Sequence, residues 1–119
     1  MPDAKTYSGA CHCGRVRYDV ATDLGQVLEC NCSHCQIKGL LLTFVPTSQF
    51  TLHSGEQELS DYQFNKKTIQ HLFCKTCGVQ PFARGKMPDG TPMVAVNVRC
   101  LEGVNPEELS KTPFNGRDM

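Results

Sequence analysis

The chain has 119 residues, a length that suits one domain over residues 1–119 with a modest hydrophobic core. Twelve Lys and Arg balance twelve Asp and Glu, so bulk charge gives no reason to expect a nucleic-acid or membrane-surface partner. The longest apolar run, GLLLTFV at 39–45, is far shorter than the roughly 20 residues that span a bilayer. The N-terminus has no apolar stretch typical of a signal peptide, so we expect a cytoplasmic protein.

Short strand-like segments follow one another along the chain. In RVRYDV (15–20), apolar and polar residues alternate, as in a half-buried strand. Further apolar or alternating runs, separated by Gly, Pro and Asp turn signals, occupy 40–45, 49–55, 59–65, 68–73 and 93–98. One short helix is predicted near the C-terminus, at 105–109, where Asn105 suits the cap and Pro106 the first helical position. The sequence therefore predicts a mainly β domain of small antiparallel sheets with at most one short helix.

Seven of the eight cysteines lie in three tight clusters. The clusters are CHCG at 11–14, CNCSHC at 30–35 and CKTCG at 74–78, and Cys100 stands apart from them. In a secreted protein this count would indicate disulfides, whereas in a reducing compartment it favours metal binding or catalysis.

Two of these clusters combine into a four-ligand site. Cys11 and Cys13 form one pair and Cys74 and Cys77 the other, and a glycine follows each pair directly, at 14 and at 78. Glycine permits the backbone conformation that a tight turn around a metal requires. A tetrahedral zinc closed by four thiolates is a structural site, and its binding free energy stabilises the fold.

The remaining cluster offers three ligands: Cys30, Cys32 and Cys35. Three protein ligands and an open fourth position are typical of catalytic zinc. Zinc with three thiolates is a poor Lewis acid, but its softness suits a fourth sulfur, and a substrate thiol held there would be a thiolate able to attack an electrophile. Because one protein ligand is missing, we expect this second zinc to be more labile than the structural one.

Other interpretations stay open. Cys100 or a histidine could close the second site, which would make the chain a non-catalytic, zinc-stabilised binding module. A zinc-free triple could instead form a disulfide in a redox protein, with Cys100 as the resolving cysteine. His71 lies three residues before Cys74 and is either a supporting or proton-transfer group near the sites or an ordinary strand histidine.

Five stretches resemble the glutathione-dependent formaldehyde-activating enzyme family, which is related to the centromere protein V domain: GACHCGRVRYDV, CNCSHC, HLFCKTCGVQPFARG, VNVRCLEG and the closing PFNGRDM. The resemblance extends from about Ser8 to Arg117. It implies a β-tent-like fold of small sheets that meet around a zinc. It also implies two zinc sites. The ligands of the structural zinc would be Cys11, Cys13, Cys74 and Cys77. The ligands of the substrate-side zinc would be Cys30, Cys32 and Cys35.

The family's activity implies a carbon–sulfur lyase, similar to an S-hydroxymethylglutathione synthase, that joins glutathione to formaldehyde. Its partner would be a small-molecule thiol, glutathione, with no nucleic acid and no membrane involved. Glutathione carries carboxylates, so we expect basic side chains near the open zinc. The candidates are Lys38, Arg84 and Arg99, because each lies close in sequence to a cysteine cluster or to Cys100.

Overall fold

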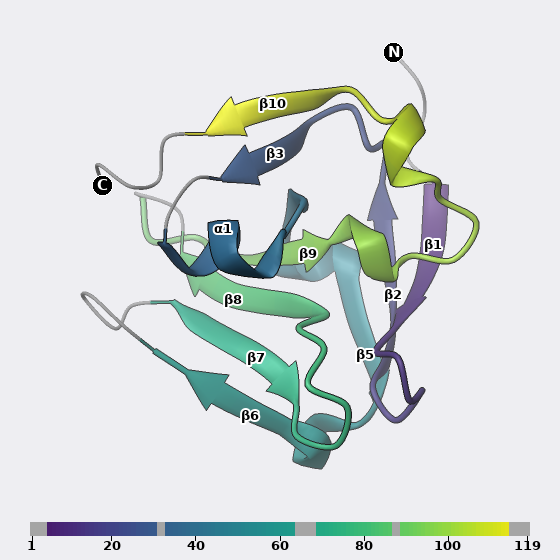
Figure 1. The fold of residues 1–119 in the computed structure, drawn as a ribbon, viewed down its shortest axis with the longest axis vertical. Helices are drawn as coiled ribbons and strands as arrows, with labels where there is room; N and C mark the ends of the chain where they lie inside the picture. The colour runs from purple at the N-terminus through teal and green to yellow at the C-terminus, as the bar shows by residue number, and fades with distance from the viewer. Residues whose placement is uncertain (1–4, 31–32, 64–68, 87–88, 115–119) are drawn as a thin grey trace.

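The structure, a computed structural model of the chain, describes residues 5–30, 33–63, 69–86 and 89–114. Two sheets make up most of this part (Figure 1). The smaller sheet has the strand order β1 (Lys5–Ala10), β2 (Arg17–Thr22), β5 (Phe50–Ser54). The larger has the order β10 (Lys111–Phe114), β3 (Val27–Cys30), β4 (Leu42–Pro46), β9 (Pro92–Asn97), β8 (Phe82–Lys86), β7 (Gln70–Cys74), β6 (Leu59–Tyr62).

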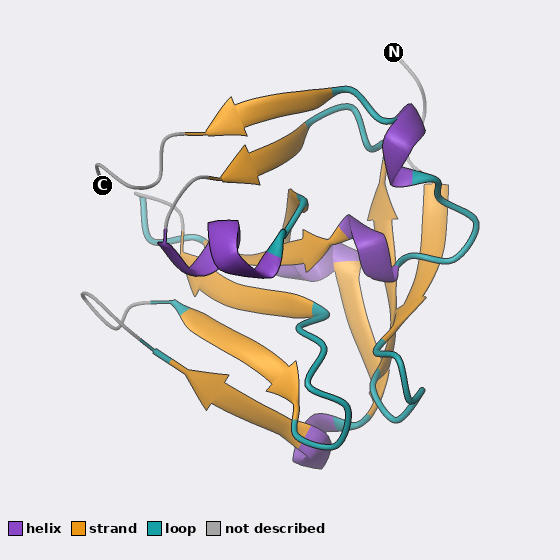
Figure 2. Cartoon of the chain, in the orientation of Figure 1, coloured by secondary structure: helices purple, strands orange, loops and turns teal. Residues whose placement is uncertain are grey.

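Neighbouring strands are antiparallel with one exception. Strand β10 pairs with β3 in parallel, from Lys111 opposite Val27 to Phe114 opposite Cys30. Strands and loops dominate the cartoon in Figure 2, and helix is confined to α1 (Ser33–Lys38) and a few short 3-10 turns. The predicted mainly β fold of small antiparallel sheets is therefore confirmed.

The helix lies elsewhere than predicted. In the described residues the α-helix is α1, whereas the segment 105–109 forms a single 3-10 turn, Pro106–Glu108. The predicted cap is present, since Oδ1 of Asn105 accepts a hydrogen bond of 3.1 Å from the backbone N–H of Glu107. The turn ends because Leu109 is already extended and leads toward β10, where pairing with β3 supplies the backbone hydrogen bonds that a longer helix would have made.

All six predicted strand segments contain a strand, β2, β4, β5, β6, β7 and β9, although residues 64–65 and 68 of two segments lie outside the described part. The strands shift from the predicted bounds by up to three residues. Alternating or continuous apolar runs bounded by turn signals were thus sufficient to locate these six strands.

The main core lies where the two sheets face each other. Tyr18 of β2, Phe50 of β5 and Phe82 of β8 form an aromatic cluster with ring centroids 4.7 to 5.7 Å apart. Tyr18 and Phe82 are almost fully buried, and the Tyr18 hydroxyl donates a hydrogen bond of 3.3 Å to the carbonyl of Pro81. Burying each of these side chains stabilises the fold by roughly 1.5–3 kcal/mol, and the cluster joins one sheet to the other.

A second, smaller core lies between α1 and the other face of the large sheet. Its buried members are Cys35, Leu40, Leu42, Ala83 and Ala95. Ala83 and Ala95 lie opposite each other on β8 and β9, and their small side chains leave room for the helix to approach the strands. This packing fixes α1, and with it Cys35, against the sheet.

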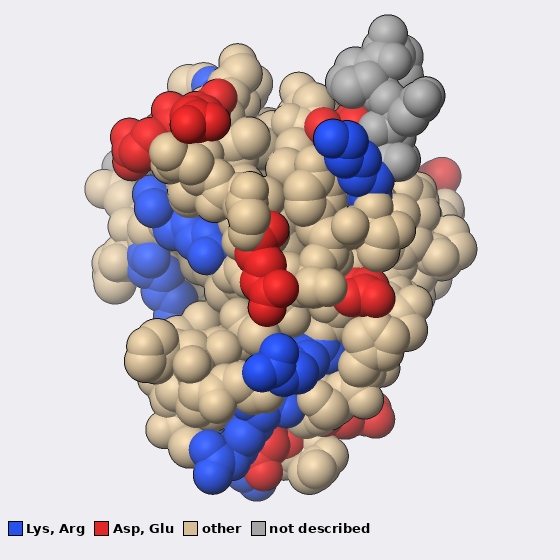
Figure 3. All heavy atoms as spheres, turned by 90° about the vertical axis from the view of Figure 1, so that its right-hand side faces the viewer, with Lys and Arg blue, Asp and Glu red and all other residues tan. Residues whose placement is uncertain are grey.

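Within the described residues no helix is long and apolar enough to cross a membrane. Acidic and basic side chains lie interspersed on the face that Figure 3 shows.

Candidate metal centre and adjoining pocket

Cys11, Cys13, Cys74 and Cys77 come together as the spacing predicted. Their four Sγ atoms all lie within 4.8 Å of one another, with 3.6 Å between Cys11 and Cys13 and 3.7 Å between Cys13 and Cys74. Four thiolates about 2.3 Å from a tetrahedral zinc would lie about 3.8 Å apart, so the residues fit that ion. The first pair lies in the β1–β2 turn and the second at the end of β7 and in the β7–β8 turn, so a metal here would link the two sheets.

Both turns have the backbone that glycine was expected to provide. Gly14 has a φ of +83° and Gly78 a φ of +82°, in the left-handed region. The amide of Gly14 donates to the carbonyl of Cys11 at 3.1 Å, and that of Gly78 donates to the carbonyl of Cys74 at 2.7 Å. Each turn therefore directs two sulfur atoms to the same side.

Backbone amides favour the thiolate form of several of these cysteines. Burial raises the pKa of Cys77, but backbone N–H donors, chiefly of Val79 and Cys13, outweigh it and bring that pKa to about 6. The backbone N–H of Arg15 lowers the pKa of Cys13. Burial raises the pKa of Cys11, although the Val16 N–H points at its sulfur from 3.4 Å. Amide donors aimed at sulfur suit a thiolate–metal site.

The second cysteine group lies around α1. Cys30 ends β3, Cys35 is a buried residue of α1, and Cys32 lies outside the described residues. Cys30 packs, half-buried, against the same small core that contains Cys35. The structure thus places these two predicted ligands on one side of the large sheet. They belong to a different part of the sequence from the four-cysteine cluster.

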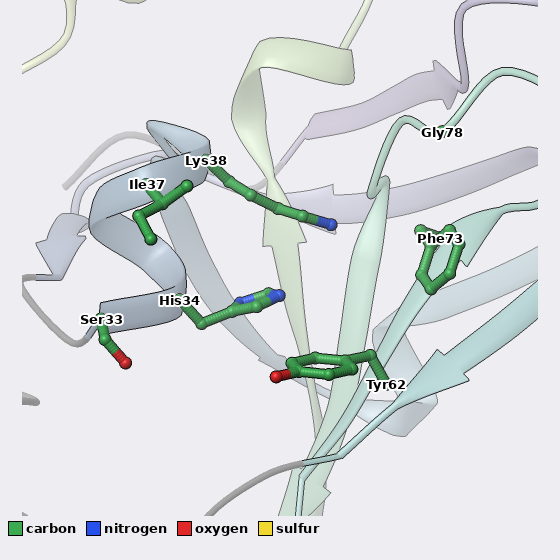
Figure 4. Close-up of a pocket in the computed structure, with 7 residues that line it drawn as sticks. All are labelled: Ser33, His34, Ile37, Lys38, Tyr62, Phe73 and Gly78. Carbon is green, nitrogen blue, oxygen red and sulfur yellow. The ribbon is translucent and has the colours of Figure 1, made fainter.

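A pocket of about 480 Å³ opens beside this group. Helix α1 forms one wall and the β6–β7 hairpin with the following turn forms the other, as Figure 4 shows; the lining residues are Ser33, His34, Ile37, Lys38, Tyr62, Phe73 and Gly78. Four of the seven come from α1, the helix that carries Cys35. Cys30 and Cys35 are not among these lining residues, so the pocket adjoins the cysteine group through α1.

His34 lines the pocket, and His71 lies directly behind it in ring contact. Nδ1 of His71 lies 3.0 Å from the carbonyl oxygen of Tyr62, and because a carbonyl only accepts, Nδ1 carries the hydrogen. The ring of His34 lies 4.3 Å from that of His71 and stacks on Tyr62 at 5.5 Å. Burial lowers the pKa of His71, and burial together with the neighbouring His71 and Lys38 lowers that of His34 to about 4. The structure thus places His71 in contact with the pocket-lining His34, whereas no sequence signal singled out His34 beyond its place in the triple.

The three basic candidates do not come together. Lys38 lines the pocket. Arg84 lies with its guanidinium 5.4 Å from the centre of the Phe50 ring and 5.3 Å from that of Phe82, on the face of β8 opposite Ala83 and α1. Arg99 is exposed, and its Nε donates to the carbonyl of Gly39 at 3.1 Å, just after α1.

Cys100 lies nearer the four-cysteine cluster than its isolation in the sequence suggested. Its Sγ is 4.0 Å from the carbonyl oxygen of Gln80. Burial, with Cys11 and Cys77 close by, raises its pKa to about 12, so the thiol is protonated at neutral pH. It is outside the set of sulfur atoms that can share a metal with Cys11.

The two sheets and the four converging sulfur atoms define a small, mainly β protein with a cysteine cluster that could hold a metal ion. The sequence pattern of the family described as glutathione-dependent formaldehyde-activating enzyme matches residues 6–113, so the chain belongs to that family. A crystal structure of a Rhodobacter sphaeroides protein is similar, with 33% sequence identity and a TM-score of 0.80. The match covers 91% of this chain and 99% of that one.

Proposed function

We propose that this chain is a zinc-dependent carbon–sulfur lyase that binds a small thiol, glutathione, and forms or cleaves an S-hydroxymethyl-type adduct. The observation that carries the proposal is the convergence of Cys30 and Cys35 on one small core beside the pocket, in a chain of this family. Cys32 is proposed as the third ligand, and the four-cysteine cluster as a structural zinc site.

The chemistry divides between metal and chain. A zinc held by Cys30, Cys32 and Cys35 would supply a soft fourth position that favours the thiolate form of a substrate sulfur at neutral pH. In the forward reaction that sulfur attacks the aldehyde carbon, a carbon–sulfur bond forms, and the carbonyl oxygen takes up the proton that the thiol released. His71 is the proposed carrier of this proton, because its Nδ1–H is held by Tyr62 and its Nε2 is the acceptor side of a neutral ring.

The alternative, a non-catalytic binding module, needs a fourth protein ligand at the second zinc. The thiol of Cys100 lies against the Gln80 carbonyl and close to Cys11 and Cys77, so it is turned toward the other cysteine cluster. The ring of His34 stacks between Tyr62 and His71. These positions favour the open site. The proposed site also requires reduced thiolates, which a reducing compartment such as the cytoplasm maintains.

Native mass spectrometry of the full chain, with and without glutathione, tests the proposal. The expected wild-type species carries two zinc ions and one glutathione. Cys35→Ser should lose one zinc and the glutathione, whereas Cys100→Ser should keep both. Two zinc ions with no thiol adduct would instead support the binding module.

Activity is measured as the rate of S-hydroxymethylglutathione formation above the uncatalysed reaction. Because this adduct forms without help, the meaningful quantity is the difference between wild type and Cys35→Ser at equal protein concentration. Equal rates for the two proteins would exclude the proposed reaction, even if both bound glutathione.

A further inference from the structure

Lys38 is a cation held at the pocket with no acidic partner. Its Nζ donates a hydrogen bond of 3.1 Å to Oε1 of Gln80 and lies 5.2 Å from the centre of the Phe73 ring. In the part of the chain that the structure describes, the ion pair found is that of His53 with Asp19, and no carboxylate pairs with Lys38. An ammonium has three N–H donors, so the one bond to the amide leaves it able to donate to a bound anion.

The described residues that line the pocket include no acidic side chain. Among these seven residues Lys38 is the one lysine or arginine, and none is an aspartate or a glutamate. Figure 4 shows the Lys38 side chain extending from α1 toward Phe73 and Gly78, above His34 and Tyr62. In the part of the pocket that the structure describes, an anionic group therefore meets the Lys38 ammonium, and the apolar part of a ligand meets aromatic rings.

Gln80 is fixed from the side of the protein core. The residue is 4% exposed, and its carbonyl oxygen accepts a hydrogen bond of 3.0 Å from Nδ2 of Asn97. It also lies three residues after Cys77, in the segment that leaves the four-cysteine cluster. Because a lysine only donates, the amide oxygen must face Lys38, and the ammonium is oriented before any ligand arrives.

Cys35 and Lys38 are three residues apart on α1, which places their side chains about 5–6 Å apart at Cβ. A thiol anchored at the cysteine group would have its nearest carboxylate within reach of Lys38 if only a few bonds separate sulfur and carboxylate. The carboxylate would form a charge-assisted hydrogen bond in a partly desolvated pocket.

We propose that Lys38, positioned by Gln80, is the residue by which this pocket selects ligands with a carboxylate. The identity of the ligand as a thiol rests on the proposed function, but recognition of the carboxylate does not. The carboxylate is bound by Lys38, on the helix that carries Cys35, and not by Arg84 or Arg99.

Two probes separate the charge from the sulfur. S-Methylglutathione has the carboxylates of glutathione and no thiol, whereas 2-mercaptoethanol has a thiol and no charge. Calorimetric titration of the zinc-loaded full chain is expected to show that Lys38→Gln weakens S-methylglutathione binding about tenfold and leaves 2-mercaptoethanol binding unchanged. Lys38→Arg should keep most of the affinity, and Lys5→Gln, the same change on the exposed part of β1, should keep all of it.

Gln80 is tested as a positioning residue. Gln80→Glu retains an acceptor for Lys38 but neutralises its charge, so it should weaken S-methylglutathione binding as Lys38→Gln does. Wild-type affinity should fall with added salt, whereas the affinity of both variants should be nearly independent of salt, which a purely structural defect would not produce.

The outcomes are distinct. Equal binding of S-methylglutathione to wild type and Lys38→Gln, or no binding to wild type, overturns the proposal for Lys38. If Lys38→Gln weakens that binding while 2-mercaptoethanol fails to bind any form, the anion site stands and the thiol-binding function fails. Circular dichroism and zinc content of each variant establish that the compared proteins are folded.

Discussion

The imidazole rings of His34 and His71 lie with centroids 4.3 Å apart and planes tilted by 55°. The contact joins α1, on which the cysteine triple ends, to β7, which ends in a ligand of the other cluster. Burial lowers the pKa of both rings, so both are neutral at pH 7 and can lie in contact without repulsion. Protonation of both rings would place two like charges in direct contact.

Stability should therefore depend on pH through His71. In the unfolded chain this histidine binds a proton near pH 6.5, while the folded chain holds it neutral to lower pH. Below about pH 6.5 the unfolded state binds more protons, so the contribution of the neutral ring is present above that pH and is lost as the pH falls through the folded pKa. Urea unfolding measured from about pH 7.5 to 5.5 should show that the free energy of unfolding falls more steeply with decreasing pH for wild type than for His71→Gln. Parallel curves of unfolding free energy against pH for the two proteins would contradict this prediction. Any release of zinc in acid would affect both proteins equally and therefore cancels in the comparison.

Loss of the four-cysteine metal should unfold the domain. Cys74 is fully buried, and its sulfur belongs to the cluster that links the two sheets. Structural zinc binds with about 10–16 kcal/mol, comparable to the whole stability of a small domain, so Cys74→Ser should lack that zinc and the cooperative thermal transition. Cys100→Ser, the same change at a nearby thiol outside the cluster, should keep both. A folded Cys74→Ser with unchanged melting temperature would show that no structural metal binds there.

Gly55 should tolerate no side chain. It has a φ of +93°, and a Cβ there would lie 2.4 Å from the carbonyl oxygen of Arg15 and 2.7 Å from Cα of Val16. Both are backbone atoms of the turn that follows the first cysteine pair, so Gly55→Ala should lower the free energy of unfolding by about 2–4 kcal/mol. Gly39→Ala is the control, because its φ of +67° carries the same strain but nothing lies within 4 Å of the added Cβ. Its cost should be about 1–2 kcal/mol, and equal losses for the two variants would exclude the steric explanation.

Arg84 should contribute to stability rather than to binding. Its guanidinium lies over the rings of Phe50 and Phe82 in the main core. Removing the charge while keeping a similar stem, in Arg84→Met, should lower the free energy of unfolding by about 0.5–1 kcal/mol and leave S-methylglutathione affinity unchanged. A loss of S-methylglutathione affinity without a loss of stability would instead show that Arg84 contributes to binding the carboxylate.

The strands that the sequence did not reveal share a physical reason. Strand β1 is mostly exposed, β3 and β10 have only four residues each, and β8 contains a glycine and two basic residues. None has the regular alternation that marks a half-buried strand, so each is specified by pairing with its neighbours rather than by local pattern. Helix α1 was not predicted, for a similar reason. Cys35 is its one buried residue, so the sequence shows no periodic pattern of apolar residues there.

The two parts of the site differ in the same way. The four-cysteine cluster depends on two local turns, each marked by a cysteine pair and a glycine, so spacing alone predicted which sulfur atoms meet. The pocket depends on how α1 lies relative to the β6–β7 hairpin, and Tyr62 and Phe73 carry no sign of this arrangement in the sequence. Closeness in sequence does not fix which way Arg84 points: adjacent strand residues face opposite sides, and Ala83 is the one that faces α1.

Strand β3 gains its outer neighbour late in synthesis. Lys111 lies opposite Val27 and Phe114 opposite Cys30, so the edge of β3 keeps unpaired backbone groups until residues 111–114 have been made. Joining segments so distant along the chain is entropically slow, and an uncovered edge is a template for pairing with another chain. The last cysteine of the metal cluster, Cys77, leaves the ribosome well before that. In a nascent chain the four cysteines that link the sheets are therefore expected to come together first. The end of β3 that carries Cys30 pairs with β10 only afterwards. Intermolecular strand exchange is expected to begin at this end of β3.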